Sequence, residues 1–212
     1  MNEINSLSLQ KTALIVVDVQ NDFCDQNGAL GKQGADTSMV KEMILNLQNL
    51  IHSARELNLP IIFIQTIHED ATDSEAWVSR GNTKNVEHNQ VCRKNTWGAD
   101  FHVVAPLETE TIVIKHRYSA FYNTRLDSIL RTFGINNLLF TGVATNVCVD
   151  STARDGFMRD YHITMISDCC AAYSEQAHLA ALQNIDSHFG RVATSNEIIE
   201  ELKSNKTSFI RI

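Results

Sequence analysis

The strongest local signal in the chain is the apolar run Ala13-Leu14-Ile15-Val16-Val17, which ends directly at Asp18. A continuous apolar run of this length, with no polar residue at alternate positions, is typical of a strand that is buried on both faces. Strands of that kind occur in parallel sheets whose two faces are covered by helices. We therefore expect this run to be a strand of such a sheet, with Asp18 at its carboxyl end.

Similar runs return along the chain, each separated from the next by a helical or polar segment. Further buried strands are predicted over residues 61–64, 111–114, 138–140 and 163–166, with a short last strand near 191–192. Apolar residues at steps of three and four predict helices over residues 37–58 and 126–133, from near Thr145, after a capping Ser174, and over 195–203. This alternation implies βαβ crossovers and a three-layer α/β fold with a mainly parallel sheet.

Residues 67–110 are the exception, because they are polar and show little periodicity. A segment of this length without regular structure is usually a lid, a binding segment or an oligomer contact. We interpret residues 1–212 as one domain that carries one functional insertion.

Composition excludes several classes of protein. The chain has 18 basic and 25 acidic side chains and a net charge of −7, which argues against a nucleic-acid-binding protein. No apolar run approaches the ~18 residues of a membrane span, and the first residues lack the pattern of a secretory signal. Five cysteines, an odd number, favour reduced thiols. We expect a soluble, cytoplasmic protein that binds neither nucleic acid nor a membrane.

Polar residues follow three of the predicted strands. Asp18 follows the first, Lys115 the third, and the fourth leads through Gly142 to Cys148. Ligands of open parallel sheets bind outside the carboxyl ends of the strands, so an acid, a base and a thiol are predicted to share one cleft. Each residue also has a plain structural interpretation, as a turn residue, a solvent-facing lysine or a small core residue.

Cys148 is expected in the first turn of a helix. The unpaired amides and the helix dipole favour negative charge there, which lowers the pKa of a thiol, and Lys115 would act in the same direction. Asp18 would accept the thiol proton and later protonate a leaving nitrogen. The turn over residues 142–145 offers amide donors to an oxyanion. The other thiols, Cys24, Cys92, Cys169 and Cys170, have no comparable context and are interpreted as structural.

Three segments, in this order, resemble the isochorismatase-like cysteine hydrolases. They are LIVVDVQNDF over residues 14–23, Lys115 after its strand, and TGVATNVCV over residues 141–149. That family includes nicotinamidases, N-carbamoylsarcosine amidases, biuret hydrolases and ureidoacrylate amidohydrolases. The resemblance implies a six-stranded parallel sheet and a homodimer or higher homo-oligomer.

The resemblance also implies a site and a reaction. Asp18, Lys115 and Cys148 would form a catalytic triad. A cis peptide between Val143 and Ala144 would direct the amides of Ala144 and Cys148 at the oxyanion. The implied reaction is metal-independent cleavage of the C–N bond of a small amide, carbamoyl or ureido compound through a thioester.

Within the family, the chain is most similar to ureidoacrylate amidohydrolases over residues 115–131 and 144–157. It departs from them after the second strand, where Thr66 and His68 stand in place of an Asn and a Trp that resemble substrate contacts. The Asp-x-His metal motif of nicotinamidases is absent, and none of the eight histidines has ligand spacing. We expect no metal and no cofactor.

Four residues are candidate substrate contacts. Phe23 would wall the pocket beside Asp18, and His68 would close it from the insertion. Tyr118 and Phe121, just past Lys115, would stack on or hydrogen-bond a planar ureido or amide group. Packing at a helix edge explains the presence of both residues equally well.

Other functions remain open. An isochorismatase-type hydrolase commonly has glycine at the nucleophile position, so Cys148 favours amide chemistry. A nicotinamidase-type hydrolase is the other enzymatic alternative within the family. An aspartate-nucleophile phosphatase is disfavoured, because it needs a second Asp where Gln20 stands. A dinucleotide-binding site of the Rossmann type is disfavoured as well, because no Gly-x-Gly-x-x-Gly follows the first strand. The remaining alternative is a non-enzymatic ligand-binding or thiol-sensing protein with the same fold.

Overall fold

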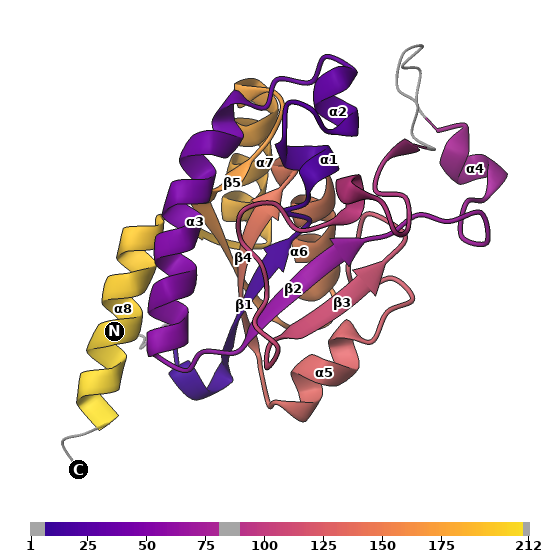
Figure 1. The fold of residues 1–212 in the computed structure, drawn as a ribbon. Coiled ribbons are helices and arrows are strands. Elements are labelled where there is room, and N and C mark those ends of the chain that lie inside the picture. Colours follow the sequence, from indigo (N-terminus) through magenta and orange to yellow (C-terminus); the bar gives the residue numbers. More distant parts are fainter. Residues whose placement is uncertain (1–6, 81–89, 210–212) are drawn as a thin grey trace.

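The first apolar run forms β1 (Thr12–Val17), an inner strand of a six-stranded sheet in the computed structural model (Figure 1). The strand order is β3-β2-β1-β4-β5-β6, and all neighbours are parallel, as predicted. The other strands are β2 (Ile61–Thr66), β3 (Thr111–Lys115), β4 (Asn137–Val143), β5 (His162–Ala171) and β6 (Gly190–Ala193). The structure describes residues 7–80 and 90–209.

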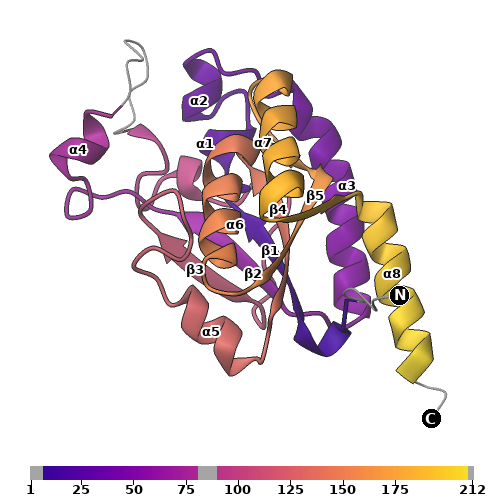
Figure 2. The ribbon, with the colours of Figure 1, turned by 180° about the vertical axis from the view of Figure 1, so that it is seen from behind.

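Helices cover both faces of the sheet, which completes the three layers (Figures 1 and 2). Because side chains alternate along a strand, Leu14 and Val16 enter one core while Ala13, Ile15 and Val17 enter the other. The first core lies under α3 (Ser38–Glu56) and α8 (Ser195–Phe209). The second lies under α5 (Leu126–Thr132), α6 (Asp150–Phe157) and α7 (Glu175–His188). Burial on both faces explains the continuous apolar run.

Short elements connect these layers. They are η1 (Leu9–Lys11), α1 (Asn21–Cys24), α2 (Ala29–Lys32), α4 (Glu75–Val78), η3 (Trp97–Ala99) and a π-helical turn, η4 (Thr145–Val149). In the long connection from β2 to β3, the amide of His68 donates to Cys92 and the amide of Lys94 to His68. Gln20, just after β1, forms an isolated bridge with Phe101. The described parts of this connection are therefore attached to the carboxyl ends of the strands.

The chain order places a crevice between β1 and β4. From β1 the chain moves outward on one side through β2 and β3, and β4, β5 and β6 fill the other side. Such a switch point is where open parallel sheets bind ligands. Val17 pairs with Gly142, whose φ is +108° and where a Cβ would lie 2.0 Å from the Val17 carbonyl oxygen. Only glycine lets the two strand ends approach this closely.

The element boundaries differ from prediction mainly in β5. The apolar run predicts a strand over residues 163–166, whereas β5 continues to Ala171 after a shift of register between Phe140 and Gly142 of β4. Polar side chains at residues 167 and 168 end the apolar run without ending the backbone pairing. The Ser174 side chain accepts a hydrogen bond from the amide of Ala177, as expected of a cap.

Candidate active site

The buried ion pair between Asp18 and Lys115 lies at the end of the crevice. Lys115 is the last residue of β3, and Asp18 follows β1 with a left-handed φ of +52°. The Nζ atom of Lys115 lies 2.7 Å from Oδ2 of Asp18, and both side chains are almost fully buried. An ion pair so deprived of water needs further hydrogen bonds to offset the cost of desolvation.

Thr66 supplies those bonds from the end of β2, between the other two strands. Its hydroxyl accepts a hydrogen bond from Nζ of Lys115 at 2.7 Å and donates one to Oδ1 of Asp18 at 3.0 Å. The Gln20 side chain fixes the Thr66 backbone, because its carbonyl accepts from the Thr66 amide and its amide donates to the Thr66 carbonyl. Four buried residues thus hold one another in place.

Cys148 reaches the same point from the end of β4. The expected cis peptide between Val143 and Ala144 is present. Cys148 also lies in the first turn of a helix, as expected, and this turn is the π-helical η4, which leads into α6. Its sulfur lies 3.5 Å from Nζ of Lys115. The structure therefore brings the three predicted catalytic residues together.

The prediction of a lowered thiol pKa is wrong for the resting protein. Burial raises the pKa of Cys148 to about 12, Lys115 lowers it only in part, and Asp18 raises it further. Only 7% of Cys148 is exposed, so the loss of hydration outweighs the attraction of one ammonium group. Burial also disfavours the charged form of Lys115, yet Asp18 and Cys148 raise its pKa above the ordinary value. At neutral pH the resting site therefore holds Cys148 as a thiol and Lys115 as a cation.

A cavity of about 170 Å³ opens onto this group. Its lining includes Lys115, Cys148, Ala144 and Thr66 from the site described above. The remaining lining residues come from α1, α2, η4, the β2–β3 connection and the segments that follow β3 and β5: Phe23, Leu30, His68, Trp77, Arg80, Val91, Arg117, Tyr118, Val147 and Tyr173. A small substrate in this cavity would contact the thiol directly.

Of the four candidate substrate contacts, three line the cavity and one does not. Phe23, His68 and Tyr118 line the cavity. Phe121 does not: it is buried in the second core, stacked on Tyr161 at 5.8 Å between ring centroids. It faces the core because the chain turns after Tyr118.

His68 is almost fully buried where it lines the cavity. Burial lowers its pKa to about 4, although Asp73 acts in the opposite direction from 3.5 Å. At neutral pH the imidazole is therefore uncharged. It can exchange hydrogen bonds with a ligand but contributes no positive charge.

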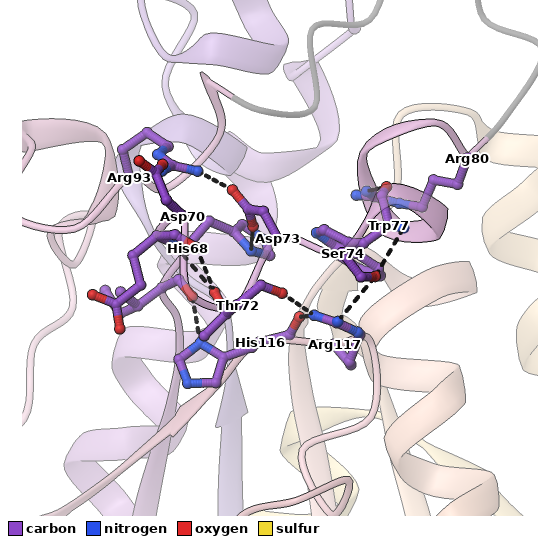
Figure 3. A network of polar contacts seen from close by, with 12 residues as sticks. His68, Asp70, Thr72, Asp73, Ser74, Trp77, Arg80, Arg93, His116 and Arg117 are labelled. Atoms are coloured by element: carbon purple, nitrogen blue, oxygen red, sulfur yellow. Dashed lines mark hydrogen bonds and ion pairs between the residues drawn. The ribbon is translucent and has the colours of Figure 1, made fainter.

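Sequence reasoning missed Trp77 and Arg80 in the wall, and Figure 3 shows both of them near Arg117. The Arg80 guanidinium lies over the Trp77 ring, 3.4 Å from its centroid, and donates through Nε to the Tyr118 hydroxyl at 2.8 Å. Arg117 donates to the carbonyl groups of Thr72 and His116. No periodic pattern marks Trp77 or Arg80, since long-range contacts place both.

Two further findings concern only the residues that the structure describes. Over residues 7–80 and 90–209, no group of three His, Cys, Asp or Glu side chains is arranged to hold a metal ion. In the same ranges, no helix is both long enough and apolar enough to cross a membrane.

Comparisons with known proteins give a consistent result. The model of the isochorismatase domain family matches residues 12–197. A ureidoacrylate amidohydrolase, RutB, from Serratia proteamaculans is 36% identical over 197 residues, which cover 87% of this chain and 79% of that protein. A cysteine hydrolase from Pseudomonas syringae pv. phaseolicola superposes with a TM-score of 0.83 at 27% identity, covering 95% of this chain and 96% of the other.

A third similarity is to an amidase. The N-carbamoylsarcosine amidase from Thermoplasma acidophilum superposes with a TM-score of 0.71 at 26% identity, over 87% of this chain and 96% of its own. A family model covers most of the sequence, and a relative more than one third identical covers most of both lengths. The chain belongs to the isochorismatase family of hydrolases.

Proposed function

We propose that the chain is a metal-independent cysteine amidohydrolase that cleaves the C–N bond of a small amide, carbamoyl or ureido compound. The observation that carries this proposal is the position of Lys115, whose Nζ lies 2.7 Å from Asp18 and 3.5 Å from the Cys148 sulfur beside a small cavity. A nucleophile, a base and a fixed cation at this spacing suit covalent catalysis. The ureidoacrylate amidohydrolase and the carbamoylsarcosine amidase named above point to the same bond type.

The first step is attack by Cys148 on the substrate carbonyl. Because the resting thiol has a raised pKa, Asp18 accepts its proton as the sulfur forms the new bond to carbon. Lys115 remains charged and stabilises the developing thiolate. The carbonyl oxygen becomes an oxyanion, for which the backbone amides of Ala144 and Cys148 are the proposed donors.

The second step breaks the C–N bond. Asp18 returns the proton to the nitrogen, so ammonia or an amine leaves and a thioester remains on Cys148. Water then attacks the thioester carbon and gives its proton to Asp18. Collapse of this second tetrahedral intermediate releases the acid or carbamate and restores the thiol.

Substrate contacts are proposed for Phe23, His68 and Tyr118. Thr66 and His68 stand where the metal motif of nicotinamidases would be, and the Thr66 hydroxyl is already bonded to Lys115 and Asp18. Its place in that network supports a reaction in which Lys115 supplies the positive charge.

The test is release of ammonia from ureidoacrylate, biuret, N-carbamoylsarcosine, nicotinamide and maleamate at neutral pH. We expect the wild-type protein to hydrolyse at least one of them. Cys148→Ala should lower that rate at least about a thousandfold, because the nucleophile is lost. Cys169→Ala is the matched control, since Cys169 is another buried free thiol and lies outside the cavity lining. Full activity in Cys148→Ala would overturn the mechanism.

Assembly and location complete the proposal. The protein forms a homodimer or a higher homo-oligomer and acts in the cytoplasm, where a reducing environment suits its five free cysteines. Light scattering of the purified protein, coupled to size-exclusion chromatography, measures the assembly directly.

A further inference from the structure

Three residues that line the cavity, Trp77, Arg80 and Tyr118, carry hydrogen-bond donors. Trp77 is 9% exposed, and its Nε1 is buried with no acceptor among the residues that the structure describes. An indole N–H can only donate. The Tyr118 oxygen accepts from Nε of Arg80, which leaves the hydroxyl hydrogen free to donate. Among the described residues, the Trp77 N–H of this wall therefore lacks an acceptor.

The same wall has an excess of positive charge. The guanidinium carbons of Arg80 and Arg117 lie 3.4 Å and 4.8 Å from the centroid of the Trp77 ring. Within residues 7–80 and 90–209, neither arginine forms an ion pair with a carboxylate. The described lining contains no Asp or Glu. Lys115 is already neutralised by Asp18, so the two guanidinium groups carry the unpaired charge of the described lining.

We propose that Trp77, Arg80 and Tyr118 form a carboxylate-binding subsite, so that the preferred substrates are small amides or ureido compounds that carry a carboxylate. This inference rests on the proposed function, because it concerns the same cavity. A carboxylate has only acceptor atoms and can receive bonds from the indole, the guanidinium and the hydroxyl together. A neutral amide would leave the guanidinium without a counter-charge.

Binding to the Cys148→Ala variant tests the subsite without turnover. The probes are two matched pairs, maleamate with maleic diamide and N-carbamoylsarcosine with its primary amide, measured by calorimetry at pH 7.5. We expect at least one acid to bind about tenfold or more tightly than its neutral partner. Adding Arg80→Gln should weaken binding of that acid by about 10- to 100-fold and leave the neutral amide within about threefold.

Further variants separate the subsite from general damage. Trp77→Phe keeps an aromatic ring but removes the N–H, so it should weaken binding of the acid by about 3- to 10-fold. Arg80→Lys keeps the charge, so its affinity for the acid should lie between the affinities of the protein with Arg80 and of Arg80→Gln. Arg125→Gln is the control, because Arg125 is exposed, outside the cavity lining, and bonded to the carbonyl of Ile112.

The outcomes distinguish this subsite from the proposed function. No binding of either acid, equal binding within both pairs, or acid binding that Arg80→Gln does not weaken would overturn the subsite. Hydrolysis of neutral amides that depends on Cys148 would then still support the proposed function. Acid binding that depends on Arg80, without Cys148-dependent hydrolysis of any panel compound, would support the subsite and contradict the proposed function.

Discussion

The Thr66 hydroxyl bridges the two charges of the buried ion pair, accepting from Lys115 at 2.7 Å and donating to Asp18 at 3.0 Å. With Oδ1 of Asp18 held by Thr66, Oδ2 faces Lys115. The orientation of the proposed base thus depends on an uncharged residue from a third strand.

Replacing Thr66 with Val tests this dependence, since valine keeps the shape and removes both hydrogen bonds. Hydrogen bonds to charged groups contribute about 1.5–3 kcal/mol, so we expect kcat to fall by about 10- to 100-fold. Steady-state kinetics at neutral pH measure this fall in kcat.

Thr66→Ser is the control, because it keeps the hydroxyl and should retain most of the activity. If Thr66→Val lowered thermal stability but kept the wild-type kcat, the hydroxyl would only stabilise the fold.

Asp18→Asn should separate thiol reactivity from hydrolysis. Asp18 raises the pKa of Cys148 through its charge and its hydrogen bond, and it also neutralises Lys115. Its neutralisation should lower the thiol pKa and speed alkylation of Cys148 by iodoacetamide by about tenfold or more at pH 8. Hydrolysis should fall by about 10²- to 10⁴-fold, because no base remains. Mass spectrometry of the labelled peptide gives the alkylation rate, and slower alkylation would contradict the assigned electrostatics.

Much of this site can be predicted from the sequence, because the carboxyl ends of parallel strands lie at the same edge of the sheet. Once residues 13–17 and 111–114 are recognised as buried parallel strands, Asp18 and Lys115 must lie at one edge of the sheet. The motif around Cys148 adds the third group and the cis peptide after Val143. The positions of Asp18 and Lys115 need only the period of the apolar residues and the direction of the strands, whereas the cis peptide is expected from the resemblance to the family.

The rest depends on tertiary packing. The thiol pKa is set by burial that no local pattern reports, so the expected helix-dipole effect on Cys148 was outweighed. Phe121 and Tyr118 are both aromatic residues just past Lys115, yet only Tyr118 reaches the cavity. Trp77 and Arg80 lie in a connection without periodicity, and contacts with Tyr118 and Arg117 place them.

Asp22 is expected to hold the cavity wall together. Its two carboxylate oxygens accept from the amide of Ala29 at 2.8 Å and the amide of Cys92 at 2.7 Å, which joins α2 to the β2–β3 connection. Asp22→Ala would leave both amides without an acceptor and should lower the free energy of unfolding by about 2–4 kcal/mol. Urea denaturation measures this loss.

Asp25→Ala is the matched control, because Asp25 accepts one exposed hydrogen bond from the amide of Asn27. It should change stability by no more than about 1 kcal/mol. Equal losses in the two variants would show that the Asp22 bonds do not hold the wall.

Stability should decline in mild alkali, since all five cysteines are buried free thiols. Burial raises the pKa of each above its ordinary value of 9.0, for Cys148 to about 12. The thiols of the unfolded chain lose protons near pH 9, while those of the folded chain keep them. The unfolded state then binds fewer protons, so the free energy of unfolding must fall as pH rises above about 9, by up to about 1.4 kcal/mol per pH unit for each thiol.

Urea denaturation at half-unit steps from pH 7.5 to 10 measures this slope below the ordinary pKa of the tyrosines. Cys169→Ala removes one of the five thiols, and the slope between pH 9 and 10 should become shallower by roughly one fifth. Comparison of slopes cancels the loss of packing that alanine causes at every pH. A free energy of unfolding that stayed constant over this range would mean that the thiols ionise as readily in the folded protein as in the unfolded chain, which is incompatible with their burial.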